Sequence, residues 1–97
     1  MGMIDIEKIK RYLSSQPVVK AWLFGSFARG EEREDSDVDI LIQFTKGVRI
    51  GLRYFHMIND LEELAERKVD LVELSTLDPF VAPFVNQEKI LIYERTT

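Results

Sequence analysis

Two aspartates one residue apart, Asp37 and Asp39, are the residues of this chain whose types and spacing most directly suggest chemistry. They begin an apolar run that we expect to be a strand, and side chains two residues apart in a strand share a face. Two carboxylates held side by side repel each other unless a cation lies between them. Mg²⁺ prefers oxygen ligands and is commonly held by one or two carboxylates together with phosphate oxygens. The pair therefore predicts a magnesium site.

A Gly-Ser turn, Gly25-Ser26, precedes this pair and lies between an apolar run and a short helical segment. Such a turn presents backbone N–H groups, a hydroxyl and a positive helix end, all of which favour phosphate. We add Arg29 and Ser36 to the nucleotide-binding candidates. Arg29 could meet a phosphate or could equally pair with loop carboxylates, whereas Ser36 is expected to hydrogen-bond within the acidic loop. The possible loop partners of Arg29 are Glu31, Glu32 and Asp35.

The elements that must position these residues follow from apolar periodicity and from turn residues. We expect strands at 18–24, 37–44, 69–74 and 90–93, and helices at 4–14, 27–30, 52–67 and within 79–87. The continuous apolar stretch 40–42 indicates a central strand that is covered on both faces. In the last two helices the expected apolar faces are Phe55, Ile58, Leu61, Leu64 and Ala65, and Phe80, Val81, Phe84 and Val85.

A third carboxylate, Asp70, lies in the expected third strand between Val69 and Leu71, which should share the core-facing side. Alternation then places Asp70 on the opposite face. If this strand pairs beside the second, Asp70 can approach the Asp37/Asp39 pair from the neighbouring strand. Glu73 is the competing candidate, but alternation puts it on the other face. The charged residues before this strand, Glu62, Glu63, Glu66, Arg67 and Lys68, are expected to form a solvated helix side.

Length and composition set the broad class of the protein. With 97 residues, 45% of them hydrophobic, the chain is expected to form one domain, residues 1–97. It has no cysteine, and neither a membrane-spanning run nor a signal peptide is evident, so a cytoplasmic location and no membrane partner are expected. The net charge of −4 argues against broad, non-specific nucleic-acid binding, which usually needs a basic surface.

The pattern Gly25-Ser26-x-Ala28-Arg29-Gly30, five residues, then Ser36-Asp37-x-Asp39 resembles the signature of the polymerase-beta-type nucleotidyltransferase superfamily. The only departure from this signature is Ile40, where Leu is commoner. In its short length the chain is similar to the minimal nucleotidyltransferases (MNT proteins) of that superfamily. The resemblance implies an α+β fold, with a small mixed sheet of about four strands flanked by helices. It also implies that Asp37, Asp39 and Asp70 hold two Mg²⁺ ions, that ATP is the substrate, and that Asp70 helps to deprotonate the attacking hydroxyl.

The acceptor is suggested by resemblance alone. MNT proteins are typically paired with a small all-helical HEPN protein that acts as an RNase toxin, and in studied cases the MNT antitoxin transfers AMP to a tyrosine of that partner. Because this chain shows no acceptor domain, a HEPN-type partner or self-association into a homo-oligomer could complete the site. Two alternatives stay open: an enzyme that modifies a small molecule, as aminoglycoside nucleotidyltransferases do, and a partner-binding module whose active site is unused.

Overall fold

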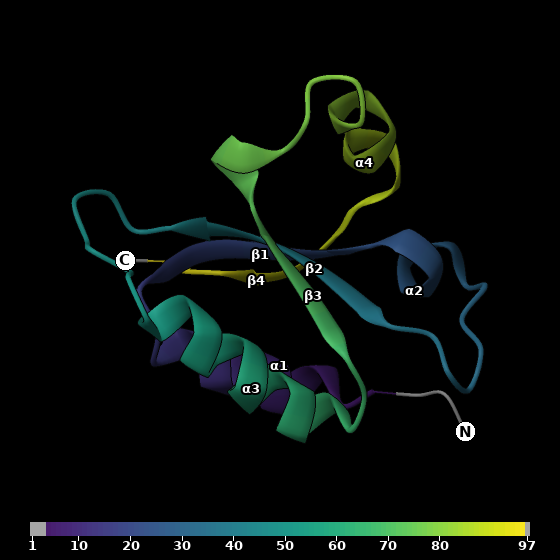
Figure 1. The fold of residues 1–97 in the computed structure, drawn as a ribbon, viewed down its shortest axis with the longest axis horizontal. Helices are drawn as coiled ribbons and strands as arrows, with labels where there is room; N and C mark the ends of the chain where they lie inside the picture. Colours follow the sequence, from purple (N-terminus) through teal and green to yellow (C-terminus); the bar gives the residue numbers. More distant parts are fainter. Residues whose placement is uncertain (1–3, 97) are drawn as a thin grey trace.

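The computed structural model describes residues 4–96, which form a four-stranded sheet with helices on both of its faces (Figure 1). In chain order the elements are α1 (Ile6–Ser14), β1 (Val18–Phe24), α2 (Gly25–Arg29), β2 (Val38–Phe44), α3 (Arg53–Ala65), β3 (Val69–Glu73), a 3₁₀ turn η1 (Leu74–Thr76), α4 (Ala82–Glu88) and β4 (Ile90–Glu94). All four strands lie where they were expected, to within one residue at each end. The short helix α2 begins at Gly25, two residues earlier than expected.

The sheet is mixed, with the strand order β3-β2-β1-β4. The inner strands β1 and β2 are antiparallel, and β4 runs antiparallel along the other edge of β1. The strands β2 and β3 are parallel, because α3 carries the chain back across the sheet between them. This arrangement confirms the expected α+β class, and it places the start of β2 beside the start of β3.

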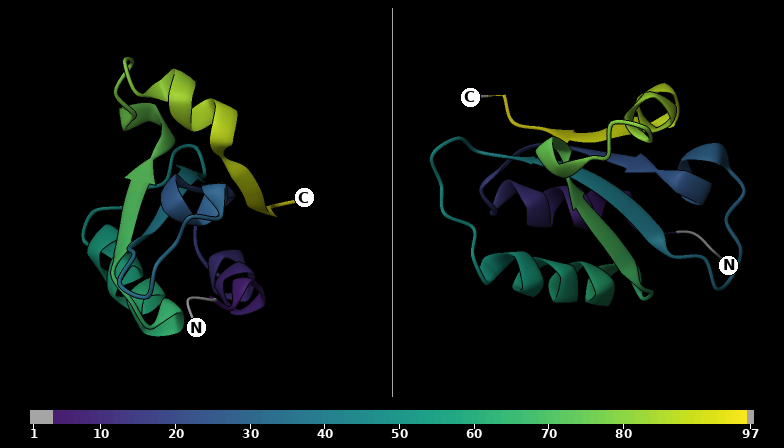
Figure 2. Two further views of the ribbon diagram at one scale, coloured as in Figure 1. Left: turned by 90° about the vertical axis from the view of Figure 1, so that its right-hand side faces the viewer. Right: turned by 45° about the horizontal axis from the view of Figure 1, so that its top comes forward.

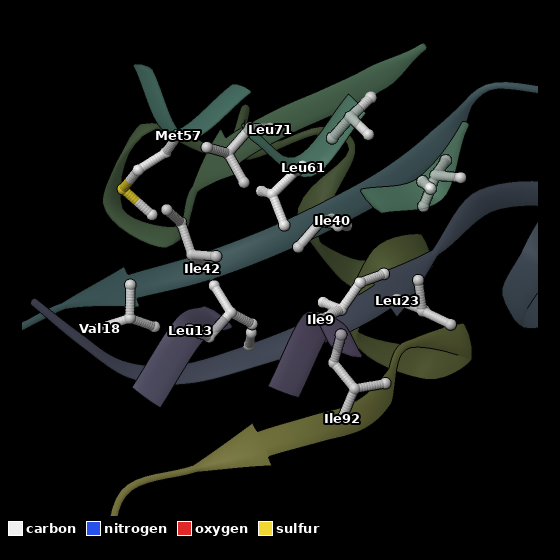
Figure 3. Packing of buried hydrophobic residues seen from close by; sticks show 14 residues of the cluster. Ile9, Leu13, Val18, Leu23, Ile40, Ile42, Met57, Leu61, Leu71 and Ile92 are labelled. Carbon is white, nitrogen blue, oxygen red and sulfur yellow. The ribbon is translucent and has the colours of Figure 1, made fainter. Parts of the chain in front are cut away.

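The main core lies on the face of the sheet that α1 and α3 cover together (Figures 1 and 2). Ile9 and Leu13 of α1 and Met57 of α3 are fully buried and point toward the strand residues between them (Figure 3). The N-terminus of α1 is capped by Asp5, whose carboxylate accepts a hydrogen bond from the Lys8 N–H at 3.2 Å.

A smaller cluster occupies the opposite face, where α4 covers part of the sheet (Figure 2). Its buried members are Trp22 of β1, Leu41 of β2 and Val85 of α4. Leu41 and its neighbour Ile40 are both fully buried although they point to opposite faces, which confirms that β2 is covered on both sides. None of the helices within residues 4–96 is long and apolar enough to cross a membrane.

Two predicted apolar faces differ from the structure. In α4 and the residues before it, Val85 is buried, but Phe80 is 88% exposed, Phe84 is 71% exposed and Val81 is also exposed. The helix has only seven residues and covers a small cluster, so one side chain suffices to fill the space beneath it. In α3 the predicted Phe55 is 61% exposed. The predicted Leu61 and Ala65 are buried, as is Met57, which was not predicted, and the three are spaced four residues apart.

Candidate active site

Asp39 and Asp70 are cross-strand partners in the parallel pair of β2 and β3. Their neighbours Val38 and Val69 are also partners and are both buried in the main core, so the two aspartates point to the opposite face. Asp70 is exposed, and Asp39 is partly buried. The structure therefore confirms the predicted adjacency of Asp39 and Asp70, with Asp70 on the face away from the core.

Asp37 lies one residue before β2, at the end of the acidic loop, and its side chain is exposed. Arg67, just beyond α3, holds this loop: its guanidinium Nη1 donates to the carbonyl oxygens of Ser36 at 3.1 Å and Arg33 at 3.2 Å. The same guanidinium lies 5.1 Å from the ring centre of Phe27 in α2, within the range of a cation–π contact. The expectation that Arg67 is merely solvated was thus wrong, because it joins the loop to α2.

The three carboxylates interact electrostatically. The pKa of Asp39 is raised to about 6, first because the side chain is desolvated and then because the charges of Asp70 and Asp37 oppose its ionisation. The Arg29 guanidinium partly offsets this effect. A carboxyl with a raised pKa beside two further carboxyls is the arrangement that a divalent cation would relieve.

The Gly25-Ser26 turn touches the carboxylate of Asp39 directly. Gly25 has φ = +72°, and a Cβ added there would lie 2.1 Å from Asp39 Oδ2, so both the backbone conformation and the space require glycine. Ser26 follows as the second residue of α2. The structure thus brings the turn and the Asp-x-Asp pair together.

Arg29 and Ser36 both make local contacts. Arg29 Nε donates to Glu31 at 2.9 Å, one of the predicted loop pairings, and its Nη1 donates to Glu88 of α4 at 3.0 Å. The Ser36 hydroxyl oxygen accepts a hydrogen bond from the Arg33 N–H at 2.6 Å, as expected for a residue that orders the acidic loop. A role in nucleotide binding stays a prediction for both residues.

Glu88 is the residue at this site that sequence reasoning missed. Its Oε1 accepts from the Gly25 N–H at 2.9 Å, while its Oε2 accepts from Arg29. The hydrogen bond from Gly25, followed by the Arg29 guanidinium, lowers the pKa of Glu88. The contact joins residues that are 63 positions apart, so no local sequence pattern predicts it. Glu73, the rejected alternative to Asp70, accepts hydrogen bonds from Ser75 N–H and hydroxyl groups instead.

The side chains fit a hard divalent cation in kind, because Asp37, Asp39 and Asp70 offer carboxylate oxygens, which suit Mg²⁺. As they are placed, however, no three Asp, Glu, His or Cys residues within 4–96 form a cluster that could hold a metal ion. Neighbouring strands are only about 4.8 Å apart. The backbones of Asp39 and Asp70, which are partners on two such strands, are therefore about this far apart.

Comparison with known proteins supports the same chemistry. Residues 7–97 match the model of the family described as polymerase beta, nucleotidyltransferase. The chain is 34% identical over 100 residues to the protein adenylyltransferase MntA of Thermococcus cleftensis, an alignment that covers 95% of this chain and all of that protein.

Solved structures share the fold. A structure assigned provisionally as a minimal nucleotidyltransferase has a TM-score of 0.72 and 32% identity, and the match covers 93% of this chain and 98% of that one. A crystal structure of a toxin–antitoxin with AMP-PNP has a TM-score of 0.81 at 20% identity, covering 96% of this chain and 76% of that chain. A complex of tri-AMPylated Shewanella oneidensis HEPN toxin with MNT antitoxin has a TM-score of 0.70 at 18% identity, covering 93% and 70%. Because residues 7–97 match the family model and a relative aligns over its full length at 34% identity, this chain belongs to the polymerase beta nucleotidyltransferase family.

Proposed function

We propose that the protein is an Mg²⁺-dependent adenylyltransferase that transfers AMP from ATP to a tyrosine hydroxyl of a small helical HEPN-type toxin, and thereby acts as its antitoxin. The adenylyltransferase named among its relatives aligns along its whole length, which supports the reaction. The structural neighbours that are toxin–antitoxin complexes, one with AMP-PNP and one with an AMPylated HEPN toxin, support the nucleotide and the partner. We assign this activity to one domain, residues 1–97, working in the cytoplasm.

The observation that argues most for this function is the position of Asp39, which lies against the Gly25-Ser26 turn and beside Asp70 on the neighbouring strand. Asp39 lies opposite Asp70 in the register of the two strands, and its Oδ2 lies against Gly25. The charge of Asp37 contributes to the raised pKa of Asp39. A turn that binds a phosphate tail and carboxylates that bind its counter-cation must be neighbours for nucleotidyl transfer.

Each residue then has a defined task. Asp37 and Asp39 would hold the metal ions, with Asp70 as a further ligand, and the Gly25-Ser26 turn would hold the terminal phosphates. Bound Mg²⁺ would neutralise the negative charge that develops on the leaving pyrophosphate. The acceptor hydroxyl attacks the α-phosphorus in line, the new oxygen–phosphorus bond forms as the bond to pyrophosphate breaks, and Asp70 accepts the hydroxyl proton. Positioning and charge stabilisation account for most of the rate gain in such reactions.

The test is an incubation of the chain with ATP labelled at the α-phosphate, Mg²⁺ and a co-expressed HEPN protein encoded beside it. Label should appear on the HEPN protein with the wild type and disappear with Asp39→Asn. Phosphopeptide mapping should locate the label on a tyrosine. Label on neither protein, together with a tight complex, would instead favour a partner-binding module. Transfer to an added aminoglycoside but not to the protein would favour a small-molecule enzyme.

A further inference from the structure

We propose that Glu88, the last residue of α4, is a positioning residue that holds the Gly25-Ser26 turn and the Arg29 guanidinium in place for the phosphate tail of the nucleotide. This inference rests on the proposed function, since it concerns how the same site receives its triphosphate. Glu88 contacts both the turn and Arg29, although it lies 59 positions from Arg29 and 63 from Gly25 in the sequence.

The contacts of Glu88 bridge two groups that we expect to meet phosphate. One carboxylate oxygen accepts from the backbone N–H of Gly25 at 2.9 Å, and the other accepts from Arg29 Nη1 at 3.0 Å. The Glu88 side chain is only 24% exposed, so these charge-assisted bonds are partly sheltered from water. The pKa of Glu88 is lowered, so the carboxylate is ionised at neutral pH and can accept both hydrogen bonds as an anion.

The position of Gly25 decides whether the turn and Asp39 can serve one ligand. Gly25 adopts φ = +72°, and its α-carbon packs so closely on Asp39 that a Cβ would collide with Oδ2. Because glycine adopts many backbone conformations readily, the turn keeps this one geometry only when its surroundings hold it there. The hydrogen bond from the Gly25 N–H to Glu88 is such a restraint, because it ties the turn to the end of α4.

The orientation of Arg29 is restrained by the same carboxylate. Its Nε donates to Glu31 and its Nη1 to Glu88, so two of the three guanidinium nitrogens are engaged. Nη2 makes no hydrogen bond or ion pair with the rest of residues 4–96. A guanidinium is planar, and its donors form a fixed fork, so holding two nitrogens fixes the direction of the third. Arg29 is thereby ready to offer Nη2 to a phosphate oxygen without losing further side-chain freedom.

A carboxylate that competed with the nucleotide at this place would have the opposite effect. Glu88 uses the donors that a phosphate could use, so it could compete with the triphosphate instead of preparing the site. A competitor would weaken nucleotide binding, and its removal would strengthen it. The two possibilities therefore differ in the sign of one measurement.

The experiment compares the Kd of MgATP with the Kd of AMP by titration calorimetry, using the full chain as wild type and as Glu88→Ala, Glu88→Gln and Glu31→Gln variants. Glu94→Ala is the matched control, because Glu94 is an exposed glutamate of β4 that pairs with Lys20 of β1. The amide signal of Gly25 in ¹⁵N-labelled protein reports the hydrogen bond without any nucleotide. The melting temperature of each variant shows whether it is folded.

Glu88→Ala should weaken MgATP binding about tenfold, the usual effect of losing a charge-assisted hydrogen bond, and should change AMP binding less than about twofold. Glu88→Gln should fall between, since its amide oxygen still accepts from Gly25. Glu31→Gln should have a smaller effect because it leaves the turn untouched, and Glu94→Ala should match the wild type. The Gly25 amide signal should shift in Glu88→Ala more than in Glu88→Gln.

Three results would overturn the inference. Tighter or equal MgATP binding by Glu88→Ala would identify Glu88 as a competitor or a bystander. Equal loss of MgATP and AMP binding would show a general structural role and no task at the phosphate tail. A wild type that binds no MgATP would refute the proposed function itself, and the positioning role would fall with it. In the first two cases the proposed function survives, so the two failures are distinguishable.

Discussion

Replacing Asp39 by asparagine should stabilise the metal-free protein at neutral pH, although it removes a proposed metal ligand. Asparagine has nearly the same shape as aspartate but has no charge to be desolvated in the fold or opposed by Asp70 and Asp37. The pKa of Asp39 is raised from 3.8 to about 6, and one pKa unit corresponds to about 1.4 kcal/mol. The ionised carboxylate therefore costs the folded state up to about 3 kcal/mol. Because Asp39 is partly exposed and salt screens its neighbours, we expect a measured gain of about 1–2 kcal/mol.

The pH dependence has a definite sign. The folded protein binds the Asp39 proton more tightly than the unfolded chain does, so stability is lost as pH rises from about 4 through about 6. Asp39→Asn cannot titrate there. The difference in stability between the variant and the wild type should be near zero at pH 4, should grow through pH 6, and should be constant above about pH 7.

The assay is urea unfolding in EDTA across this pH range, followed by the fluorescence of Trp22, which is 8% exposed in the folded chain. Asp35→Asn, an exposed aspartate of the same loop, is the control and should change stability by less than about 0.5 kcal/mol. If Asp39→Asn is less stable than the wild type at pH 7.5, or if the difference does not depend on pH, then burial and the neighbouring carboxylates do not raise the pKa of Asp39 as described.

Three further outcomes follow from the same geometry. Millimolar Mg²⁺ should raise the melting temperature of the wild type and leave that of Asp70→Asn nearly unchanged; equal shifts would mean that the ion binds elsewhere. Gly25→Ala should lower stability by about 1–3 kcal/mol in urea unfolding, since its Cβ strikes Asp39 and its φ is positive; a neutral result would contradict the tight contact. Arg67→Ala should lose about 1–3 kcal/mol of stability and also transfer activity by freeing the acidic loop, whereas the exposed Arg49→Ala should do neither. Full activity of Arg67→Ala would show that the loop orders itself.

The strands and the pairing of the acidic residues were predictable because both depend on local alternation. Val69 and Leu71 are buried while Asp70 between them is exposed, as a two-residue period requires. The register that sets Asp70 beside Asp39 then needs only the parallel pairing of two neighbouring strands. The apolar periodicity of the sequence predicted burial correctly in elements of which only one side contacts the core.

Other features depended on contacts between distant parts of the chain. The exposure of Phe84 could not be read from its apolar character, because it depends on how little of α4 the sheet covers. Glu88 and Arg67 are ordinary charged residues in sequence, and their partners lie 63 and 31 residues away. A charged side chain that hydrogen-bonds to a distant turn or loop leaves little trace in the neighbouring sequence. Its role is therefore evident only from the tertiary structure.

The central claim is that Asp37, Asp39 and Asp70 gather around a divalent ion beside the Gly25-Ser26 turn. Paramagnetic broadening by Mn²⁺ in ¹⁵N-labelled protein, with a non-hydrolysable ATP analogue, tests it most directly. We expect the amide signals of the three aspartates and of the turn to broaden first, and Asp39→Asn to abolish the effect. Broadening centred elsewhere in the chain, or unchanged in Asp39→Asn, would contradict it.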